Sequence, residues 1–364
     1  MSQAFGQIQA IVAKLKPRND DDIIDRLHYI ITPSILFTFS FIVGAKQFVG
    51  QPIQCWAPAE FKRQWSRYAE GYCFVENTYF VGMNERFPMR PIERENREIH
   101  YYQWVPFILV GQALLMMLPK LLWNAFNWKS GLDARSLIQR ARNLAELGEY
   151  DDKDKACREI AMRFDIGLRQ AQRRQMTQIG EKGGIPELPE SLNGQWASTS
   201  FVTFCYLTLK MLNLCSIFFQ LYILTCFLGT VKGSNSEHFW GFIVLKDLFE
   251  GRDWHKSGAF PRINMINEKI FLFIWFWLIA LVAVGALNLI YWLYHAFCLS
   301  SADRFVRSQL RLSVKNLPND VELKYFVRTG LSYDGITILR LIALNCDPTV
   351  CSLLIGKLWT RFQD

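Results

Sequence analysis

The sequence predicts an all-α membrane protein: a four-transmembrane-helix bundle with an amphipathic N-terminal helix and a helical cytoplasmic domain. Hydrophobic residues make up 51% of the 364 residues, and they gather in four blocks separated by charged segments. Each block reaches the roughly 20 residues that a helix needs to cross a bilayer. One such block could be a buried core helix of a soluble protein, but four of them favour a chain that crosses the membrane repeatedly.

The spanning helices are placed at 27–48, 101–128, 200–231 and 269–301. The first block has no lysine, arginine, aspartate or glutamate from Leu27 to Ala45, and the fourth has none from Ile270 to Ala302. The second and third blocks each contain one lysine. Apolar stretches of this length are the main sequence signal of membrane helices.

The segment 1–26 begins with apolar residues at spacings of three and four, the pattern of an amphipathic helix. These residues are Phe5, Ile8, Ile11, Val12 and Leu15. Such a helix could lie on the membrane surface or fold into a cavity, and the pattern alone leaves both open. No short apolar core with a small-residue cleavage site follows, so we expect the first spanning helix to be an uncleaved anchor.

Four spans place both termini on the same side of the membrane, and the basic residues indicate which side. Lysine and arginine favour cytoplasmic segments, and a basic cluster directly follows the fourth span. Its members are Arg304, Arg307, Arg311 and Lys315. We therefore expect 1–26, 129–199 and 302–364 in the cytoplasm, and the loops 49–100 and 232–268 outside. The net charge of +8 then reflects topology and contact with membrane lipid, with no support for nucleic-acid binding.

The two long cytoplasmic segments are predicted to be helical. The candidate helices are 133–149, 152–178, Ala302–Asn316, Asp320–Thr329, Tyr333–Asn345 and Pro348–Phe362. The spacing of Cys346 and Cys351 could suggest a metal site, but a helix start is the better interpretation. Asp347 is a typical N-cap residue, and Pro348 suits the first helical position.

Polar residues share faces of two spanning helices. Ser34 and Thr38 lie on one face of the first span, and Asn213, Ser216 and Gln220 lie on one face of the third. They could form hydrogen bonds between helices or line a wetted pore. We favour interhelical bonds for the third span and leave the first open.

Lys210 is a charge inside an apolar block, which by default indicates a functional role. Because Met211 to Thr230 already spans a bilayer, we expect Lys210 to extend to the inner interface and keep its charge in water. Titratable residues within the spans are otherwise few. We find no catalytic constellation, no phosphate-binding glycine loop and no metal-ligand cluster, so an enzyme, a cofactor and a metal site are not expected.

An aromatic run with a proline opens the second span. It consists of Tyr101, Tyr102, Gln103, Trp104, Val105 and Pro106. The rings are typical of a membrane interface, and the proline predicts a bend in the helix. Further motifs stand at Cys55–Phe61, Tyr72–Phe80, Gly251–Trp254, Phe260–Arg262, Asn267–Phe271, Trp275–Trp277 and Leu339–Ala343. Together and in this order they resemble the innexins, the invertebrate gap-junction channel proteins related to pannexins.

The resemblance implies a structural subunit of a gap junction in the plasma membrane at cell–cell junctions. Innexin subunits form a homo- or hetero-oligomeric ring, which the resemblance makes an octamer, and two rings on adjacent cells dock through their outer loops. Ions and small molecules pass through by diffusion. The candidate pore-lining residues are Gln3, Gln7, Lys14, Ser34 and Thr38, and the candidate docking residues are Trp56, Phe61, Phe260, Pro261 and Arg262.

The chain departs from the family pattern in its second outer loop. Innexins usually carry two cysteines in each outer loop, but the loop 232–268 has none, and Arg262 is followed almost directly by Asn267. A segment is missing there. In the first loop, Cys55 could pair with Cys73 or with Cys226, or remain free. Since disulfides fix loop geometry, a non-docking hemichannel or an assembly-modulating subunit is the alternative. From another class, a four-helix adhesion or scaffold protein at cell contacts also fits.

Overall fold

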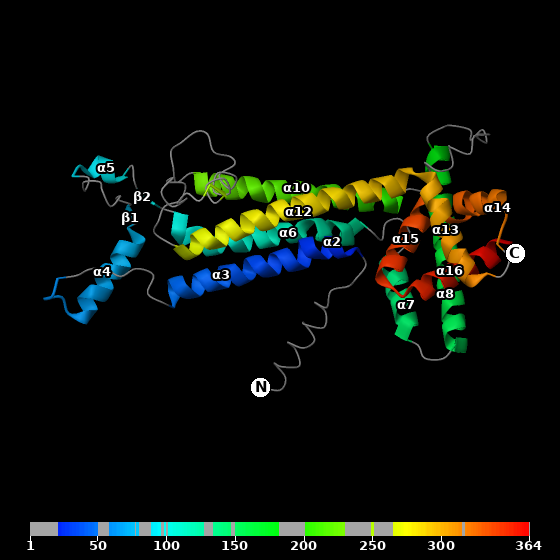
Figure 1. Cartoon of the computed structure of the whole chain (residues 1–364), viewed down its shortest axis with the longest axis horizontal. Coiled ribbons are helices and arrows are strands. Elements are labelled where there is room, and N and C mark those ends of the chain that lie inside the picture. The colour runs from blue at the N-terminus through cyan, green and yellow to red at the C-terminus, as the bar shows by residue number, and fades with distance from the viewer. Residues whose placement is uncertain are drawn as a thin grey trace. The chain divides into compact units, whose positions relative to one another are not determined.

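Most of the described chain is helical (Figure 1). The computed structural model describes residues 21–49, 58–76, 78–79, 89–95, 98–99, 101–126, 134–146, 150–181, 201–229, 249–250, 265–314 and 317–363. Among these residues, four helices are long and apolar enough to cross a membrane: Ile23–Phe48, Tyr102–Ala125, Phe201–Phe227 and Lys269–Phe297. The predicted fold class, all-α with four spanning helices, is confirmed. The predicted N-terminal helix lies outside the described residues.

The spanning helices are built from the following elements. The first joins α2 (Ile23–Arg26), the π-helical turn η1 (Leu27–Ile31) and α3 (Thr32–Phe48). The second joins the 3-10 turn η2 (Tyr101–Trp104) and α6 (Val105–Phe126). The third is α10 (Phe201–Gly229), and the fourth is α12 (Met265–Phe297).

The π-helical turn η1 ends at Ile31, two residues before Pro33, which is the second residue of α3. Proline has no N–H for the carbonyl four residues earlier, and its ring collides with that carbonyl in a regular α-helix. A π turn is wider than an α turn, and single π turns occur inside longer helices. We attribute η1 to this local demand, because the chain is helical on both sides of it.

The described residues fall into two compact units. The first, Ile31–Leu118 with Leu214–Val284, is called here the bundle unit. Hydrogen bonds and ring contacts within it give the order of its helices. Listed by helix pair, they are Ser40 with Pro106 for α3–α6, Gln220 with Gln112 for α6–α10, Phe227 with Phe271 for α10–α12, and Trp277 with Thr32 for α12–α3. The four helices therefore close into one bundle in which each touches two others.

The segment between the first and second spans adds short elements to the bundle unit. Helix α4 (Arg63–Val75) is followed by strand β1 (Thr78–Tyr79), helix α5 (Pro91–Glu95) and strand β2 (Glu98–Ile99). The two strands pair antiparallel, with Thr78 opposite Ile99 and Tyr79 opposite Glu98. This small ribbon brings the end of α4 back to the start of the second span.

The second compact unit, here the cap unit, combines Met1–Ile30, Pro119–Asn213 and Gly285–Asp364. Its helices beyond the spans are α7 (Ala134–Glu146), α8 (Tyr150–Glu181), α13 (Leu299–Ser313), α14 (Asp320–Tyr325), the π turn η4 (Phe326–Leu331), α15 (Ser332–Asn345) and α16 (Pro348–Gln363). The predicted helices of this region are confirmed. So is the start of α16, where the Asp347 carboxylate accepts a hydrogen bond from the Thr349 N–H at 3.1 Å.

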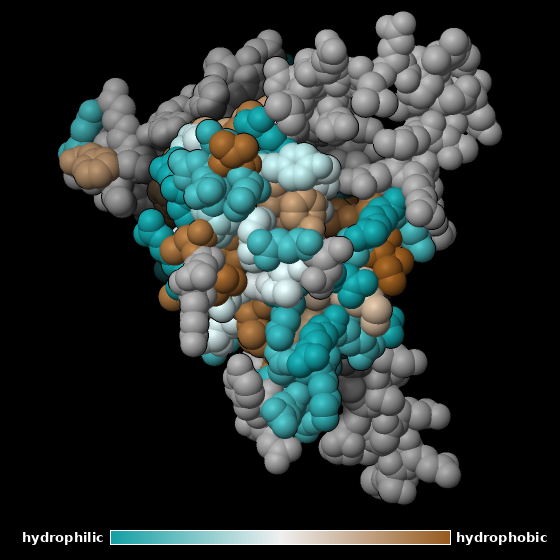
Figure 2. Space-filling model, turned by 90° about the vertical axis from the view of Figure 1, so that its right-hand side faces the viewer, coloured by the Kyte–Doolittle hydropathy of each residue, from teal (hydrophilic) through white to brown (hydrophobic). Residues whose placement is uncertain are grey.

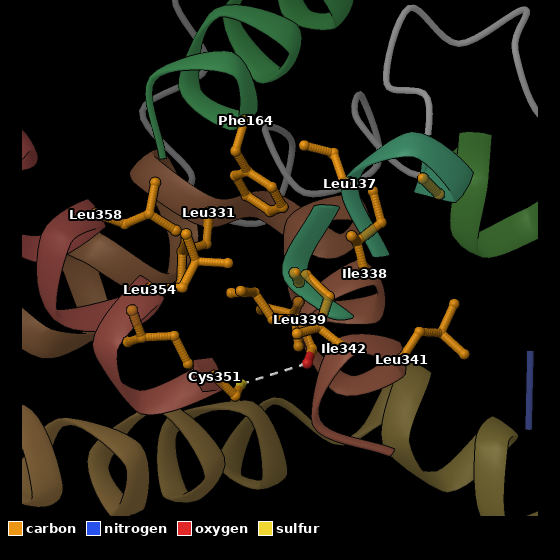
Figure 3. Close-up of a cluster of buried hydrophobic side chains, with 14 of the residues drawn as sticks. Leu137, Phe164, Leu331, Ile338, Leu339, Leu341, Ile342, Cys351, Leu354 and Leu358 are labelled. Carbon is orange, nitrogen blue, oxygen red and sulfur yellow. Dashed lines mark hydrogen bonds between the residues drawn. The ribbon is translucent and has the colours of Figure 1, made fainter. Parts of the chain in front are cut away.

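Helix α15 lies at the centre of the core of the cap unit (Figure 3). Ile338, Leu339 and Leu341 on this helix are completely buried, and Phe164 of α8 is completely buried in the same cluster. The Cys351 thiol donates to the Leu339 carbonyl at 3.5 Å, the dashed line in Figure 3. Burial raises the pKa of Cys351 to about 12, so this thiol stays protonated.

The same core includes the ends of the spanning helices. Trp123, Tyr206 and Trp292 belong to it, and Asp334 of α15 caps the start of α10 by accepting from the Thr203 N–H at 2.9 Å. The capping explains why a carboxylate is buried in a hydrophobic helix. On the face turned to the viewer in Figure 2, hydrophilic and hydrophobic residues are interspersed. The cap unit is therefore one folded body that contains both spanning and extramembrane residues.

Candidate functional site

The signature run that opens the second span holds the end of α4. The Tyr102 hydroxyl donates to the Phe74 carbonyl at 2.7 Å, and the Gln103 side-chain amide donates to the same carbonyl at 2.8 Å and to that of Val75 at 3.3 Å. The rings of Phe74 and Tyr102 lie 5.3 Å apart. Carbonyls in the last turn of a helix have no partner within the helix, so these side chains complete the C-terminus of α4.

The first span holds the same run from the other side. The Ser40 hydroxyl donates to the Pro106 carbonyl at 2.9 Å, and the Gln47 side chain donates to the Gln103 carbonyl at 3.3 Å. The run therefore connects α3, α6 and α4. We call Ser40, Gln47, Tyr102, Gln103 and Phe74 the outer clamp.

The prediction that Pro106 bends the second span is wrong. Pro106 is the second residue of α6, where a backbone N–H has no partner within the helix and proline is tolerated. The proline inside α6 is Pro119. The sequence pattern identified a helix start correctly but placed that start too early, at Tyr101, which made Pro106 look internal.

Replacing Gln103 with alanine should loosen α4 from the bundle unit. The variant loses two hydrogen bonds, each contributing about 0.5–1.5 kcal/mol net. We expect amide hydrogen exchange across Arg63–Val75 to accelerate by about tenfold, since about 1.4 kcal/mol is a factor of ten in the opening equilibrium. Gln64→Ala, on the exposed side of α4, is the matched control. Equal exchange in Gln103→Ala and Gln64→Ala would contradict a clamping role.

A second polar cluster lies in the cap unit, where the chain enters the first span. Asp22 and Asp25 are buried, and the Lys210 ammonium lies 2.5 Å from an Asp22 oxygen and 2.7 Å from an Asp25 oxygen. Lys210 itself is 4% exposed. The expectation that Lys210 extends to the interface is therefore wrong, because two buried carboxylates on the first span give its charge a closer partner.

Neutral donors complete the coordination of the two carboxylates. Asn288 and Trp292 of α12 donate to Asp22 at 2.8 and 2.9 Å. Tyr206 and Asn213 of α10 donate to Asp25, each at 3.0 Å. Burial alone raises the pKa of Asp22, but attraction to Lys210 and these hydrogen bonds outweigh it and lower the pKa to about 2. Asp22 is therefore ionised at any physiological pH.

Asp21 extends the cluster to α6 and α15. The Lys120 ammonium lies 2.6 Å from one Asp21 oxygen, and the Arg26 guanidinium lies 3.3 Å from the other. Asn345 of α15 donates to the Asp21 backbone carbonyl at 2.9 Å and accepts from Arg26. We call Asp21, Asp22, Asp25, Arg26, Lys120 and Lys210 the anchor cluster. It balances three carboxylates with three cations and fixes the chain directly after residue 20.

A weak signal for the anchor cluster was present in the sequence. An isolated lysine in an apolar block needs a counter-charge, and an acidic run stands directly before the first span. The third span is confirmed as an interhelical seam, since Asn213 binds Asp25, Ser216 contacts the Met116 sulfur at 3.7 Å and Gln220 donates to the Gln112 carbonyl at 3.1 Å.

The first span behaves differently. Ser34 and Thr38 are both exposed, and the Thr38 hydroxyl donates within α3 to the Ser34 carbonyl at 2.8 Å. Thr38 thus satisfies its own hydroxyl, and both polar residues lie on the outside of the bundle near the exposed rings of Phe37 and Phe41. Exposed polar residues on this span are compatible with a pore formed between subunits.

Several predicted site residues belong to neither the outer clamp nor the anchor cluster. Phe61, before α4, is exposed, and Cys73 lies half-buried on α4, one residue before the clamped Phe74. The other predicted residues lie outside the described part of the chain: Gln3, Gln7, Lys14, Cys55, Trp56, Phe260, Pro261 and Arg262. The pairing of Cys73 and the pore and docking roles stay predictions. Among the described residues, no group of three histidine, cysteine, aspartate or glutamate side chains is arranged to hold a metal ion.

The described residues form four apolar helices, a helical cap and two polar clusters that hold chain segments in place. This arrangement is that of a polytopic membrane protein. The profile of the Innexin family matches residues 21–263 and 262–362. The chain belongs to the innexin family.

Individual relatives cover almost the whole chain. Innexin unc-9 of Caenorhabditis elegans is 35% identical over 389 aligned residues, which cover 100% of this chain and 98% of that protein. Innexin-11 of the same organism is 32% identical over 96% of this chain and 81% of its own length, and Innexin-17 is 32% identical over 96% of both. The 389 aligned positions exceed the 364 residues of this chain, so the alignment leaves gaps in it.

Proposed function

We propose that the chain is a subunit of a ring-shaped gap-junction channel that passes ions and small molecules passively. The exposed polar residues Ser34 and Thr38 on α3 carry the proposal. The interior of the bundle unit is filled by side chains such as Leu36, Met116 and Leu278, each at most 3% exposed. Conduction therefore needs a path between subunits, and Ser34 and Thr38 are polar groups suited to line it.

The N-terminal segment would complete the pore. The anchor cluster fixes residues 21–26 against α6 and α10 through buried ion pairs and against α12 through hydrogen bonds. Residues 1–20 directly precede this fixed segment in the chain. From there the amphipathic pattern of 1–16 would direct apolar side chains to the helices and Gln3, Gln7 and Lys14 to the water-filled pore. Wide pores discriminate by diameter and by rings of charge.

The topology and the assembly are parts of the same proposal. The basic residues after α12 favour a cytoplasmic position for the cap unit and both termini, which would leave the outer clamp outside. Subunits would assemble with copies of themselves or with other innexins, as an octamer by the family resemblance. Docking to a ring on the adjacent cell would use Trp56 and Phe61 of the first outer loop and Phe260–Arg262 of the second.

A non-docking hemichannel is the second candidate, and the second outer loop favours it. The loop 232–268 has no cysteine, and the family profile matches in two parts that meet at residues 262 and 263. That position is where the sequence indicates a missing segment. Without cysteines the loop cannot form the disulfide bridges that would fix a docking surface.

Dual voltage clamp on paired cells that express only this chain tests the proposal. Junctional conductance would establish docking, and non-junctional current alone would make the chain a hemichannel subunit. The same recording is repeated in cells that also express a second innexin. If the protein reaches the cell surface but neither experiment gives a current, the channel proposal is contradicted and the adhesion or scaffold alternative is supported.

Deleting residues 2–16 should change pore selectivity. We expect larger fluorescent dyes to pass, because the deletion removes the predicted lining of the pore mouth while leaving the anchor cluster intact. Dye uptake and unitary conductance measure the change. The control is the double substitution Lys14→Gln and Lys16→Gln, which removes charge but keeps the segment. Unchanged selectivity in the deletion would place residues 1–16 on the membrane surface.

A further inference from the structure

A pocket lies in the cap unit where the start of α10, the end of α12 and helix α15 meet. Its lining includes Thr203, His295, Cys298, Tyr333, Thr337 and Arg340. None of the six charged residues of the anchor cluster lines the pocket, although Tyr206 and Trp292, which donate to that cluster, do. Arg340 brings a full positive charge to it.

Arg340 is a buried cation without a counter-charge among the described residues. Its side chain is 8% exposed, one guanidinium nitrogen donates to the Ser301 hydroxyl at 3.1 Å, and the guanidinium carbon lies 5.1 Å from the centre of the Phe305 ring. The Arg340 Nε is buried without a hydrogen-bond partner. Lys210, by comparison, has two carboxylates. Arginine stays protonated in proteins, and a buried charge is costly unless it is paired.

A second guanidinium lies beside this site. Arg304 donates to the Tyr294 hydroxyl at 3.0 Å and to the Ser300 carbonyl at 3.2 Å. The His295 ring shares the Ser301 hydroxyl with Arg340, at 2.6 Å. The end of α12 and the start of α13 therefore present donors to an anion, and no described carboxylate forms an ion pair with either arginine.

An exposed apolar face of α12 leads away from the arginines. Leu287, Ile290 and Tyr294, at spacings of three and four, are 68%, 62% and 49% exposed. Residues at these spacings lie along one side of a helix. A ligand that matches both features has an anionic head and long apolar chains.

We infer that the Arg340 pocket binds the headgroup phosphate of an anionic phospholipid, whose acyl chains follow the exposed face of α12. Arginine binds phosphate oxygens through two parallel N–H groups, a geometry that the unpartnered Nε leaves open. The apolar face favours a lipid over a soluble phosphate. Assignment of this lipid to the cytoplasmic leaflet rests on the proposed topology, but binding itself does not depend on channel activity.

Binding to the purified full-length protein in detergent tests the inference. The probes are dioctanoyl phosphatidylglycerol, dioctanoyl phosphatidylcholine and glycerol 3-phosphate, which separate charge from acyl chains. We expect phosphatidylglycerol to bind most tightly. Arg340→Gln should raise its Kd at least about tenfold, since the variant loses charge-assisted hydrogen bonds that are roughly twice as strong as neutral ones. Arg304→Gln should raise the Kd less.

The control is Arg311→Gln, an exposed arginine of α13 with the same change in charge; its Kd should match the wild type. If Arg340→Gln does not fold, Arg304→Gln against Arg311→Gln still decides, because Arg304 is exposed. Equal affinity for phosphatidylcholine, equal affinity for glycerol 3-phosphate, or an unchanged Kd in the arginine variants would each overturn the inference. Loss of binding with normal conductance would leave the channel proposal standing.

Discussion

Lys210→Met should lower the free energy of unfolding by roughly 3–5 kcal/mol, the range for removing one partner of a buried ion pair. The variant leaves Asp22 and Asp25 buried without their cation, and methionine fills a similar volume, so charge dominates the effect. The measurement is the thermal unfolding midpoint of the purified full-length protein, followed by tryptophan fluorescence. Lys324→Met, on the exposed face of α14, is the control and should unfold at the wild-type temperature.

A compensated variant separates charge from packing. Asp22→Asn and Asp25→Asn combined with Lys210→Met replace the charges by neutral groups of similar shape, which buried ion pairs often tolerate. This variant should unfold at a higher temperature than Lys210→Met. Two results would show that the anchor cluster does not hold the first span. One is an equal drop of the unfolding midpoint in Lys210→Met and in the compensated variant, and the other is a Lys210→Met midpoint that matches that of Lys324→Met.

Phe164→Ala should destabilise the cap unit by about 3–5 kcal/mol, the usual effect of deleting a buried phenylalanine. Phe164 is completely buried, and its ring approaches to 3.4 Å the point where a Cβ on Gly335 would stand. The surrounding structure relaxes only partly after such a deletion, so a cavity remains. Phe164→Leu keeps most of the volume and should cost less than about 1.5 kcal/mol.

Thermal unfolding and gel filtration of the full-length protein measure this second effect. Met162→Ala on the same helix, at a side chain that is 41% exposed, is the control. Because the core of the cap unit includes Tyr206 and Trp292 of the spanning helices, Phe164→Ala should also reduce the fraction of oligomer in gel filtration. Normal stability with normal assembly would mean that the spans do not depend on the cap core.

The outer clamp and the anchor cluster share one physical logic. In each, side chains of neighbouring elements satisfy groups on a segment that the fold must hold still. These groups are the last carbonyls of α4 in the first case and the acidic entry to α2 in the second. The outer clamp uses neutral hydrogen bonds, and the anchor cluster uses ion pairs that are largely removed from water. Disruption of the anchor cluster is therefore expected to have the larger energetic effect.

The sequence by itself determined the features that depend on near neighbours. Apolar length gave the four spans, and the periodicity of three and four with Asp347 and Pro348 at a helix start gave the helices of the tail. The signature residues also gave the family, which the comparisons established independently. Each of these signals lies within one stretch of about 30 residues or fewer.

Only the tertiary structure decided which distant residues meet. The partner of Lys210 lies 185 residues away, so the periodicity of either helix could not reveal it, and extension to the interface was the simpler interpretation. Pro106 proved harmless because the α-helix begins one residue before it. Arg340 stood in the sequence only as a member of the motif Leu339–Ala343, and the packing of α15 against α12 and α13 decided that its charge is buried. Ion pairs and burial depend on how helices pack, and that information is not local in the chain.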